Sequence, residues 1–370
     1  MKNNRTFLEK LLDGAEVEWK SLGKVTDIKT GQSVSKNIIA QNPGIYPVIN
    51  SGRDPLGFIN EWNTENDPIG ITTRGAGVGS ITWQEGKYFR GNLNYSVTIK
   101  SDYELNVRFL YHVLLHFQKE IHNLCSFTGI PALNASELKK LEIPIPPLSV
   151  QTEIVRILDA LTALTSELTS ELILRQKQYE YYREKLLSFD SLEQLNSGGG
   201  KKKLIDVAKI KNGKDWKHLG EGNIPIYGSG GIMGYVDTYS YDKPTVLIPR
   251  KGTITNIFYL EEPFWNVDTI YYTEIDTTQI LPKYFYHFMK TVDLTKLDTG
   301  SGRPSLTQAI LNEIPIFVPS IEEQHRIVSI LDKFEALTNS ITEGLPLAIE
   351  QSQKRYEYYR ELLLNFPGRE

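Results

Sequence analysis

The chain has 370 residues and a formal net charge of −4, so it lacks the overall basic charge typical of nucleic-acid-binding domains. Its single cysteine excludes an internal disulfide framework. No run approaches the roughly 18 apolar residues of a membrane span and the N-terminus has no apolar signal segment, so we expect a soluble, cytoplasmic protein with about two or three domains.

A large internal repeat divides the chain into two halves. The string YEYYRE occurs at residues 179–184 and again at 356–361. Other matching blocks keep the same order in both halves: VTDIKTG with VAKIKNG, YPVINSG with IPIYGSG, TGIPAL with TGSGRPSL, and QTEIVRILD with QHRIVSILD. A repeat of this length predicts two large equivalent units with a pseudo-twofold relation.

The first half begins with a short helix tail and continues as a globular unit. Residues 1–18 contain FLEKLLDG, which resembles the strings REKLLSF and RELLLNF that end the two halves. Residues 19–147 hold short β-like runs such as PIGITT and GSITW, bounded by turn residues, followed by the helical patch NVRFLYHVLLHFQKEI. Short strands followed by a helical patch predict an α+β domain.

Residues 148–190 are predicted to form one long helix. Apolar residues recur there at spacings of three, four or seven: Ile154, Leu158, Leu161, Leu168 and Leu172. A helix over residues 150–188 would be roughly 57 Å long, too long to lie inside one small domain. We expect it to pack against its own repeat as an antiparallel, coiled-coil-like pair. It also contains the four-residue tandem repeat TSELTSEL at residues 165–172.

The second half repeats this plan with two differences. Residues 191–203, which include GGG and KKK, are predicted to be a linker. A second α+β domain follows at residues 204–320, and a helical region occupies residues 321–370. Within that region Gly344 and Pro346 are predicted to break or kink the helix.

Motifs for covalent chemistry are missing from the sequence. There is no HExxH, no CxxC and no P-loop, and GAGVG at residues 75–79 falls short of a dinucleotide-binding loop. The asparagine-proline-proline-aromatic motif of amino-methyltransferases is also missing. We therefore predict a protein that is not itself an enzyme, with no catalytic residue, no metal site and no cofactor in this chain.

A binding surface for DNA is the remaining interpretation. Loops that carry Arg, Asn, Ser and Thr can donate hydrogen bonds to base edges, while Lys holds phosphates. Arg74 and Arg250 are the strongest candidates because they align between the halves. Each candidate could instead be an ordinary solvated surface residue. The candidates are Arg53, Arg74, Lys87, Arg90, Asn92 and Asn94 in the first domain, and Tyr227, Arg250, Lys251, Thr253, Asn256 and Arg303 in the second.

The repeated YEYYRE strings place an apolar face on each helix. Residues at i, i+3 and i+7 point the same way in a helix, which predicts either helix packing, a docking surface for a partner subunit, or both. These residues are Tyr179, Tyr182 and Leu186 in the first copy and Tyr356, Tyr359 and Leu363 in the second.

The motif EIPIPPLSVQTEIVRILD at residues 142–159 and its repeat EIPIFVPSIEEQHRIVSILD at residues 313–332 resemble a known family, the specificity subunits (HsdS) of type I restriction-modification systems. Both are similar to the proline-rich exit from a target-recognition domain into a conserved helix. FLEKLLDGAEVEWKSLG and TSELTSEL resemble the IC subclass, in which four-residue repeats in the central helix adjust the DNA spacer. TGSGRPSL resembles the family's upstream loop. TGIPAL lacks its Gly-Arg pair, so a role for Arg303 does not carry over to the first domain.

The resemblance implies a fold and a function. The fold is α+β, with two target-recognition domains joined by two long antiparallel helices. Each domain would read one half of a bipartite, asymmetric site in double-stranded DNA. The helices would set the spacer and dock two modification (methyltransferase) subunits, through which restriction (translocase and nuclease) subunits join. Catalysis and S-adenosylmethionine would belong to the modification subunit. The alternatives are an orphan DNA-binding or scaffold protein without a modification partner, and an autonomous enzyme.

Overall fold

The chain folds into two compact units that do not follow the order of the sequence. The computed structural model describes residues 6–52, 54–194, 199–299 and 302–368. Unit 1 consists of Met1–Glu167 and Ile349–Glu370, and unit 2 of Leu168–Ala348. The helical regions 148–190 and 321–370, expected to be separate domains, are thus each divided between the units.

Unit 1 is an α+β domain with a four-stranded, a three-stranded and a two-stranded sheet. The strand orders are β2-β8-β5-β6, β4-β3-β7 and β1-β9. Its elements before the long helix are α1 (Phe7–Leu12), β1 (Glu18–Ser21), α2 (Leu22–Val25), β2 (Thr26–Thr30), α3 (Lys36–Gln41), β3 (Pro43–Ile49), β4 (Phe58–Ile59), β5 (Ile69–Thr72), β6 (Ile81–Trp83), β7 (Phe89–Arg90), β8 (Asn94–Ile99), α4 (Val107–His116), α5 (Gln118–Asn123), α6 (Ala135–Leu138) and β9 (Glu142–Ile145).

Unit 2 repeats the same sheets in the same order. Its strand orders are β11-β17-β14-β15, β13-β12-β16 and β10-β18, so each strand has a counterpart in unit 1. The predicted internal repeat is therefore present in the fold. The elements are α8 (Phe189–Gln194), β10 (Gly200–Lys203), α9 (Leu204–Val207), β11 (Ala208–Lys211), β12 (Ile224–Gly228), β13 (Gly231–Val236), β14 (Thr245–Pro249), β15 (Phe258–Leu260), β16 (Trp265–Asn266), β17 (Ile270–Ile275), α10 (Pro282–Met289), the 3₁₀ helix η1 (Leu294–Leu297), α11 (Gln308–Asn312), β18 (Pro315–Val318) and α12 (Ile321–Asn339).

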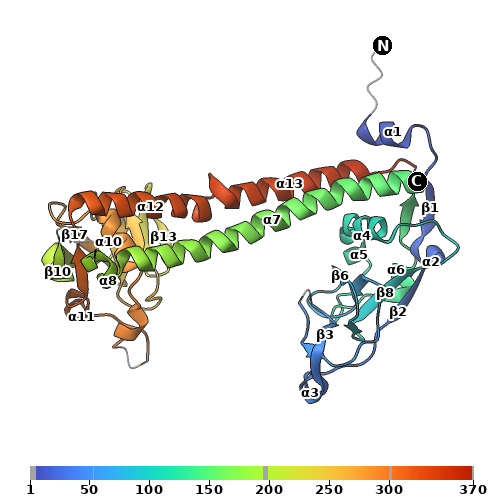
Figure 1. Cartoon of the computed structure of the whole chain (residues 1–370), viewed down its shortest axis with the longest axis horizontal. Helices are drawn as coiled ribbons and strands as arrows, with labels where there is room; N and C mark the ends of the chain where they lie inside the picture. Colours follow the sequence, from blue (N-terminus) through green and yellow to red (C-terminus); the bar gives the residue numbers. More distant parts are fainter. Residues whose placement is uncertain (1–5, 53, 195–198, 300–301, 369–370) are drawn as a thin grey trace, which may run out of the picture. The chain divides into compact units, whose positions relative to one another are not determined.

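Helix α7 (Leu148–Leu187) is continuous, as its apolar periodicity predicts. In unit 1 its N-terminal part lies beside α13 (Gly344–Leu364), as Figure 1 shows. The Thr165 and Ser352 hydroxyls are 2.8 Å apart, and nearer the start of α7 Ile154 shares one buried core with Leu363. Residues further along α7 therefore lie beside residues nearer the start of α13. The two helices run in opposite directions, and the predicted antiparallel packing is confirmed within unit 1.

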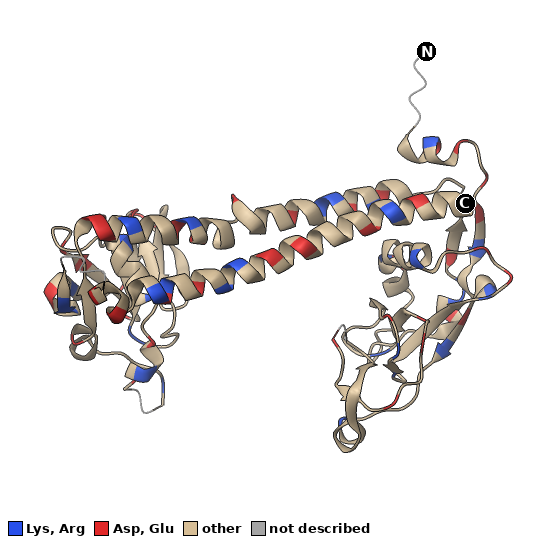
Figure 2. Ribbon diagram, in the orientation of Figure 1, with Lys and Arg blue, Asp and Glu red and all other residues tan. Residues whose placement is uncertain are grey.

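The exposed faces of the long helices carry both signs of charge. Acidic and basic residues are interspersed along α7 and α13 (Figure 2), and pairs such as Glu171 with Arg175 and Glu350 with Lys354 are one helical turn apart. Such pairs support exposed helices by a few tenths of a kcal/mol each, roughly 0.2–0.5. No helix in the described part of the chain is both long and apolar enough to span a membrane.

The predicted helix break lies between α12 and α13. Gly344 adopts a φ of +76°, and a Cβ atom there would lie 2.6 Å from the carbonyl oxygen of Ala336. Only glycine satisfies both conditions without strain. Pro346 falls in the first turn of α13, where its missing N–H costs no helical hydrogen bond.

The predicted linker is partly a strand, which corrects the sequence interpretation. Residues 200–203 form β10, which pairs antiparallel with β18. Residues 195–198 lie outside the described part. Lys201 pairs with Glu193 at 2.7 Å and Lys203 with Glu313 at 2.5 Å. These lysines make contacts within the unit because the strand pairing holds them in place.

Each unit contains one fully buried glutamine that joins a helix start to the domain. In unit 2 the Gln324 amide donates to the carbonyl oxygens of Gln279 and Pro319 at 3.0 and 2.9 Å, and its oxygen accepts from the Leu281 N–H at 2.7 Å. Gln151 makes the equivalent three bonds in unit 1. The glutamine in QTEIVRILD and QHRIVSILD thus has the same structural role in both copies.

Replacing Gln324 with leucine is expected to destabilise unit 2 strongly. The change leaves three backbone groups unpaired, one in a buried and two in part-buried hydrogen bonds, and an unpaired buried group costs about 1–3 kcal/mol. Urea denaturation of the full chain should show a lower unfolding midpoint for Gln324→Leu than for the control Gln176→Leu, which alters an exposed glutamine of α7. Equal midpoints for the two variants would contradict this role.

Candidate nucleic-acid interface

In unit 1 the loop after β5 is held against the TGIPAL loop by backbone bonds. The Leu133 N–H donates to the carbonyl oxygen of Thr73 at 2.8 Å, and the Gly75 N–H donates to that of Pro131 at 3.0 Å. Arg74 lies between these bonds and pairs with Ala132. The side chain of Arg74 is exposed, so the loop fixes its backbone and presents its guanidinium to solvent.

Unit 2 repeats this framework with a different register from the one expected. The Leu306 N–H donates to the carbonyl oxygen of Arg250 at 2.8 Å, the Gly252 N–H donates to that of Pro304 at 3.1 Å, and Lys251 pairs with Ser305.

The sequence alignment of Arg74 with Arg250 is therefore wrong by one residue. Arg74 corresponds to Lys251, and Arg250 corresponds to Thr73. The reliable landmark is the glycine that follows, because Gly75 and Gly252 both adopt positive φ, +93° and +83°.

Two further loops complete the same surface in each unit. The Thr73 N–H donates to the carbonyl oxygen of Leu93 in unit 1, and the Arg250 N–H donates to that of Thr269 in unit 2, both at 2.9 Å. The Asn256 amide donates to the carbonyl oxygen of Ser229 at 3.0 Å. We call these sets the unit 1 loop cluster (residues 50–52, 73–80, 91–93 and 126–133) and the unit 2 loop cluster (residues 228–231, 250–257, 267–269 and 302–306).

Most predicted DNA-binding residues fall in these two clusters. Arg53 lies outside the described residues. The unit 1 loop cluster contributes Arg74 and Asn92, both exposed. The unit 2 loop cluster contributes five residues, which are Arg250, Lys251, Thr253, Asn256 and Arg303. Arg250 and Asn256 are half-buried, and the other three are exposed.

Arg90 and Asn94 are buried, and we withdraw them as DNA contacts. The Arg90 guanidinium donates to the Asn94 side-chain oxygen at 2.6 Å and to the carbonyl oxygens of Ile69, Asp67 and Tyr95. Burial lowers the pKa of this guanidinium. Arg90 therefore joins the strands of unit 1 from inside. In unit 2 the residue at the position of Arg90 is Asn266, which is also buried. The interior position is therefore the same in both units.

Lys87 and Tyr227 are not members of the loop clusters, although Tyr227 directly precedes residue 228 and its carbonyl oxygen accepts from the Val267 N–H at 3.0 Å. The Lys87 ammonium lies over the Trp62 ring, 4.4 Å from its centroid, and 3.9 Å from the Glu65 carboxylate. Tyr227 packs against Phe258, with ring centroids 5.6 Å apart. Both residues are thus engaged in contacts within their own units.

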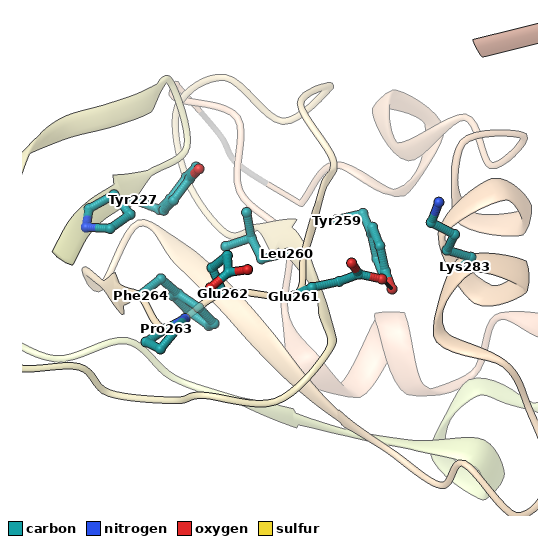
Figure 3. A pocket seen from close by; sticks show the side chains of 9 residues that line it. Tyr227, Tyr259, Leu260, Glu261, Glu262, Pro263, Phe264 and Lys283 are labelled. Carbon is teal, nitrogen blue, oxygen red and sulfur yellow. Dashed lines mark hydrogen bonds between the residues drawn. The ribbon is translucent and has the colours of Figure 1, made fainter. Parts of the chain in front are cut away.

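Tyr227 also lines a cavity of about 510 Å³ in unit 2. Figure 3 shows two acids, Glu261 and Glu262, on its wall and one cation, Lys283. The Tyr259 hydroxyl donates to the Glu261 carboxylate at 2.5 Å. With more acid than base on its wall, this cavity is unsuited to phosphate, and we do not include it in the candidate interface.

The first tyrosine of each YEYYRE string belongs to a Tyr-His-Asp link in which the histidine is fully buried and the aspartate is partly exposed. In unit 2, Nε2 of His287 lies 2.9 Å from the Asp332 carboxylate, and Nδ1 lies 3.4 Å from the Tyr179 hydroxyl. Burial raises the pKa of Tyr179 to about 12 and lowers that of His287. A protonated phenol donating to a neutral imidazole fits both shifts.

Unit 1 has the same link. Its histidine and aspartate come from the first half of the chain and its tyrosine from the second half. Nε2 of His112 lies 2.8 Å from the Asp159 carboxylate, and Nδ1 lies 3.3 Å from the Tyr356 hydroxyl. The second YEYYRE string thus packs against the α4 helix of unit 1, and the first packs against the α10 helix of unit 2. Two strings are present because each unit needs this contact and takes it from the other half of the chain.

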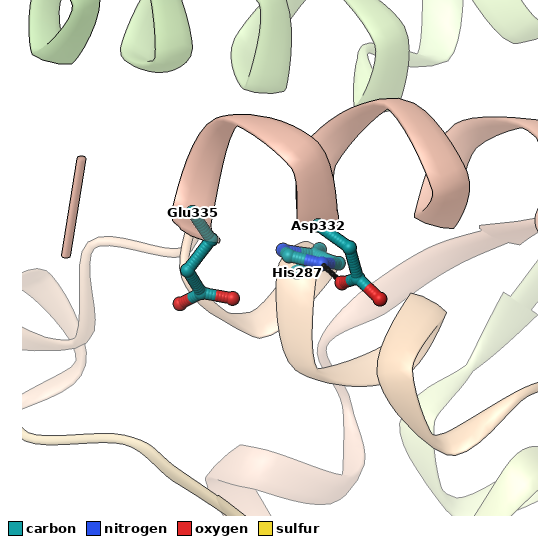
Figure 4. A group of neighbouring side chains, drawn as sticks. All are labelled: His287, Asp332 and Glu335. Atoms are coloured by element: carbon teal, nitrogen blue, oxygen red, sulfur yellow. Dashed lines mark hydrogen bonds and ion pairs between the residues drawn. The ribbon is translucent and has the colours of Figure 1, made fainter. Parts of the chain in front are cut away.

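Figure 4 shows His287 and Asp332 beside Glu335, three groups whose ligand atoms lie within 4.8 Å of one another. Both ring nitrogens of His287 already have partners, and Glu335 accepts from the Tyr286 hydroxyl at 3.0 Å. Thr162 follows Asp159 where Glu335 follows Asp332, so the cluster is not repeated in unit 1. We assign these three residues to packing between α10 and α12.

The other predicted helix residues line the same packing surfaces. Tyr182 stacks on Phe334 with ring centroids 5.6 Å apart, and Leu186 packs against the unit 2 core. In unit 1, Tyr359 and Leu363 pack in the core. The sequence analysis did not select Tyr181 and Tyr358, which are 57% and 63% exposed. They occupy the same position in the two strings.

The sequence matches the protein-family model of the type I restriction modification DNA specificity domain twice, at residues 15–175 and 196–351. The chain belongs to the type I restriction-modification specificity subunits. It is 44% identical to "Putative type I restriction enzyme specificity subunit S.HindORF215P" of Haemophilus influenzae, over 99% of this chain and 100% of the relative. It is 33% identical to the EcoR124I/EcoR124II specificity subunit of Escherichia coli, over 98% and 97%.

Solved structures agree on the fold. The S subunit of a type I system from M. genitalium superposes with a TM-score of 0.66 at 24% identity, covering 96% of this chain and 98% of that one. The predicted family and α+β class with two recognition domains are thus confirmed, and the orphan alternative is not favoured. The IC-like subclass stays a prediction.

Proposed function

We propose that each unit reads one half of a bipartite, asymmetric site in double-stranded DNA through its loop cluster. One observation carries this proposal: the clusters share a backbone framework but differ in side chains. Thr73 and Arg74 stand where unit 2 has Arg250 and Lys251. A common framework with different donors and acceptors is what two readers of unlike sequences require.

We propose that two modification subunits dock on the long helices, one at Tyr181 and one at Tyr358. The other tyrosines of the strings are explained by contacts within each unit. An exposed aromatic ring at the same position of both repeats fits two copies of the same partner. Restriction subunits then join through the modification subunits.

Catalysis is proposed to belong to the modification subunit, together with its S-adenosylmethionine. The sequence of this chain lacks the amino-methyltransferase motif, and the relatives are named as specificity subunits. In this proposal the chain supplies no reacting group and acts by positioning the methyltransferase on its target.

The test is a methylome of cells that express this chain with a modification subunit from the same system. Single-molecule sequencing should show methylated adenines in a new bipartite motif with a fixed spacer, and the motif should vanish when this chain is omitted. An assembled complex with S-adenosylmethionine that methylates no new motif would refute the proposal.

A further inference from the structure

Asn92 and Asp268 occupy the same position in the two units. β3 pairs parallel with β7, which ends at Arg90, and β12 pairs parallel with β16, which ends at Asn266. Asn92 and Asp268 each follow two residues later, in the short turn before the next strand. The two units thus place an amide and a carboxylate at equivalent sites.

The surrounding backbone holds this turn inside each loop cluster. The residues that follow, Leu93 and Thr269, accept from the N–H groups of Thr73 and Arg250 at 2.9 Å. Both turn side chains are exposed, and that of Asp268 is 65% exposed. A fixed backbone with a projecting polar side chain is suited to hydrogen bonding with a base edge.

Asp268 lies among cations, where a phosphate would also bind. Its carboxylate is 4.0 Å from the Lys251 ammonium, and its carbonyl oxygen accepts from the Arg250 guanidinium at 3.3 Å. A carboxylate in a phosphate-binding surface repels the DNA backbone. That repulsion is offset if the carboxylate accepts a hydrogen bond from the amino group of cytosine.

We infer that Asn92 and Asp268 are base-reading residues that select different bases, Asn92 an adenine and Asp268 a cytosine. An amide both accepts and donates, which matches N6 and N7 of adenine, whereas a carboxylate only accepts, which matches N4 of cytosine. The inference rests on the proposed function. It explains how one framework can read two unlike half-sites.

The test exchanges the two side chains in the full chain assembled with its modification subunit. Binding sites are selected from a random DNA library for the wild-type complex and for the Asp268→Asn and Asn92→Asp variants. Asp268→Asn should replace cytosine by adenine at one position of one half-site, and Asn92→Asp should do the reverse in the other. Each change in base preference should be about 10-fold or more.

Asp242→Asn is the matched control. It removes the same charge from an exposed aspartate of unit 2 that lies outside the loop cluster, before the start of β14, whereas the loop-cluster segment 250–257 follows the end of that strand. The selected sequence should not change in this variant.

Three outcomes separate the two proposals. A wild-type complex that selects no bipartite site would refute the proposed function. A bipartite site whose half-sites are unchanged in both exchanged variants would refute only the base-reading inference. Weaker binding of Asp268→Asn and Asp268→Ala with an unchanged sequence would assign Asp268 to positioning Lys251, which also overturns it.

Discussion

Deleting Thr169–Leu172, one of the two TSEL copies, is expected to shorten the spacer between the half-sites by about one base pair. Removing four residues shortens a helix by roughly 6 Å and rotates its end by about 400°, which is about 40° past a full turn. One base pair advances about 3.4 Å and rotates by roughly 34°. The two rotations agree closely, which matches a change of one base pair. Both half-sites should remain unchanged because the deleted residues lie in α7, outside both loop clusters.

The methylome of the deletion variant provides the measurement. As a control, replacing the same four residues by alanines keeps the helix length, and this variant should keep the wild-type spacer. A deletion that alters a half-site while the spacer stays fixed would show that the TSEL repeat does not act as a spacer element.

Replacing Tyr181 and Tyr358 together with alanine is expected to abolish stable binding of the modification subunits. Aromatic anchors at the centre of an interface contribute about 2 kcal/mol or more each, roughly a 30-fold change in affinity. Each single variant should bind one modification subunit instead of two, because the two positions are equivalent. Native mass spectrometry of the assembled complexes would measure the stoichiometry.

The control for this prediction is Tyr239→Ala, an exposed tyrosine of unit 2 that lies outside the long helices. It should retain both modification subunits. If the double variant Tyr181→Ala and Tyr358→Ala also retained two subunits with unchanged affinity, the partner surface would have to lie elsewhere on the chain.

The sequence predicted the duplication, the α+β class and the long helix because these depend on patterns repeated over many residues. The helix break was also predictable, since Gly344 and Pro346 act locally. The side-chain environments were not. Arg90 follows a turn-rich stretch and resembled a surface residue, and only the strand pairing shows that its guanidinium points inward.

The candidate site was predicted in its loops but not in its register. Two arginines suggested the alignment of Arg74 with Arg250, whereas the backbone aligns Gly75 with Gly252. A side chain at a loop tip can change without altering the fold, but a φ near +90° strongly favours glycine. Glycines would therefore have been the better landmarks for aligning the halves.

Each unit contains a helical segment from the other half of the chain, and this has a consequence for synthesis of the protein. The core of unit 1 contains Leu363, Leu364 and Phe366, whereas unit 2 ends at Ala348. At about 5–20 residues per second, a ribosome needs roughly 10 to 40 s to pass from residue 167 to the end. The first unit to be made is thus completed after the second, and a frameshift just after codon 348 would damage the N-terminal recognition unit while leaving all of unit 2 encoded.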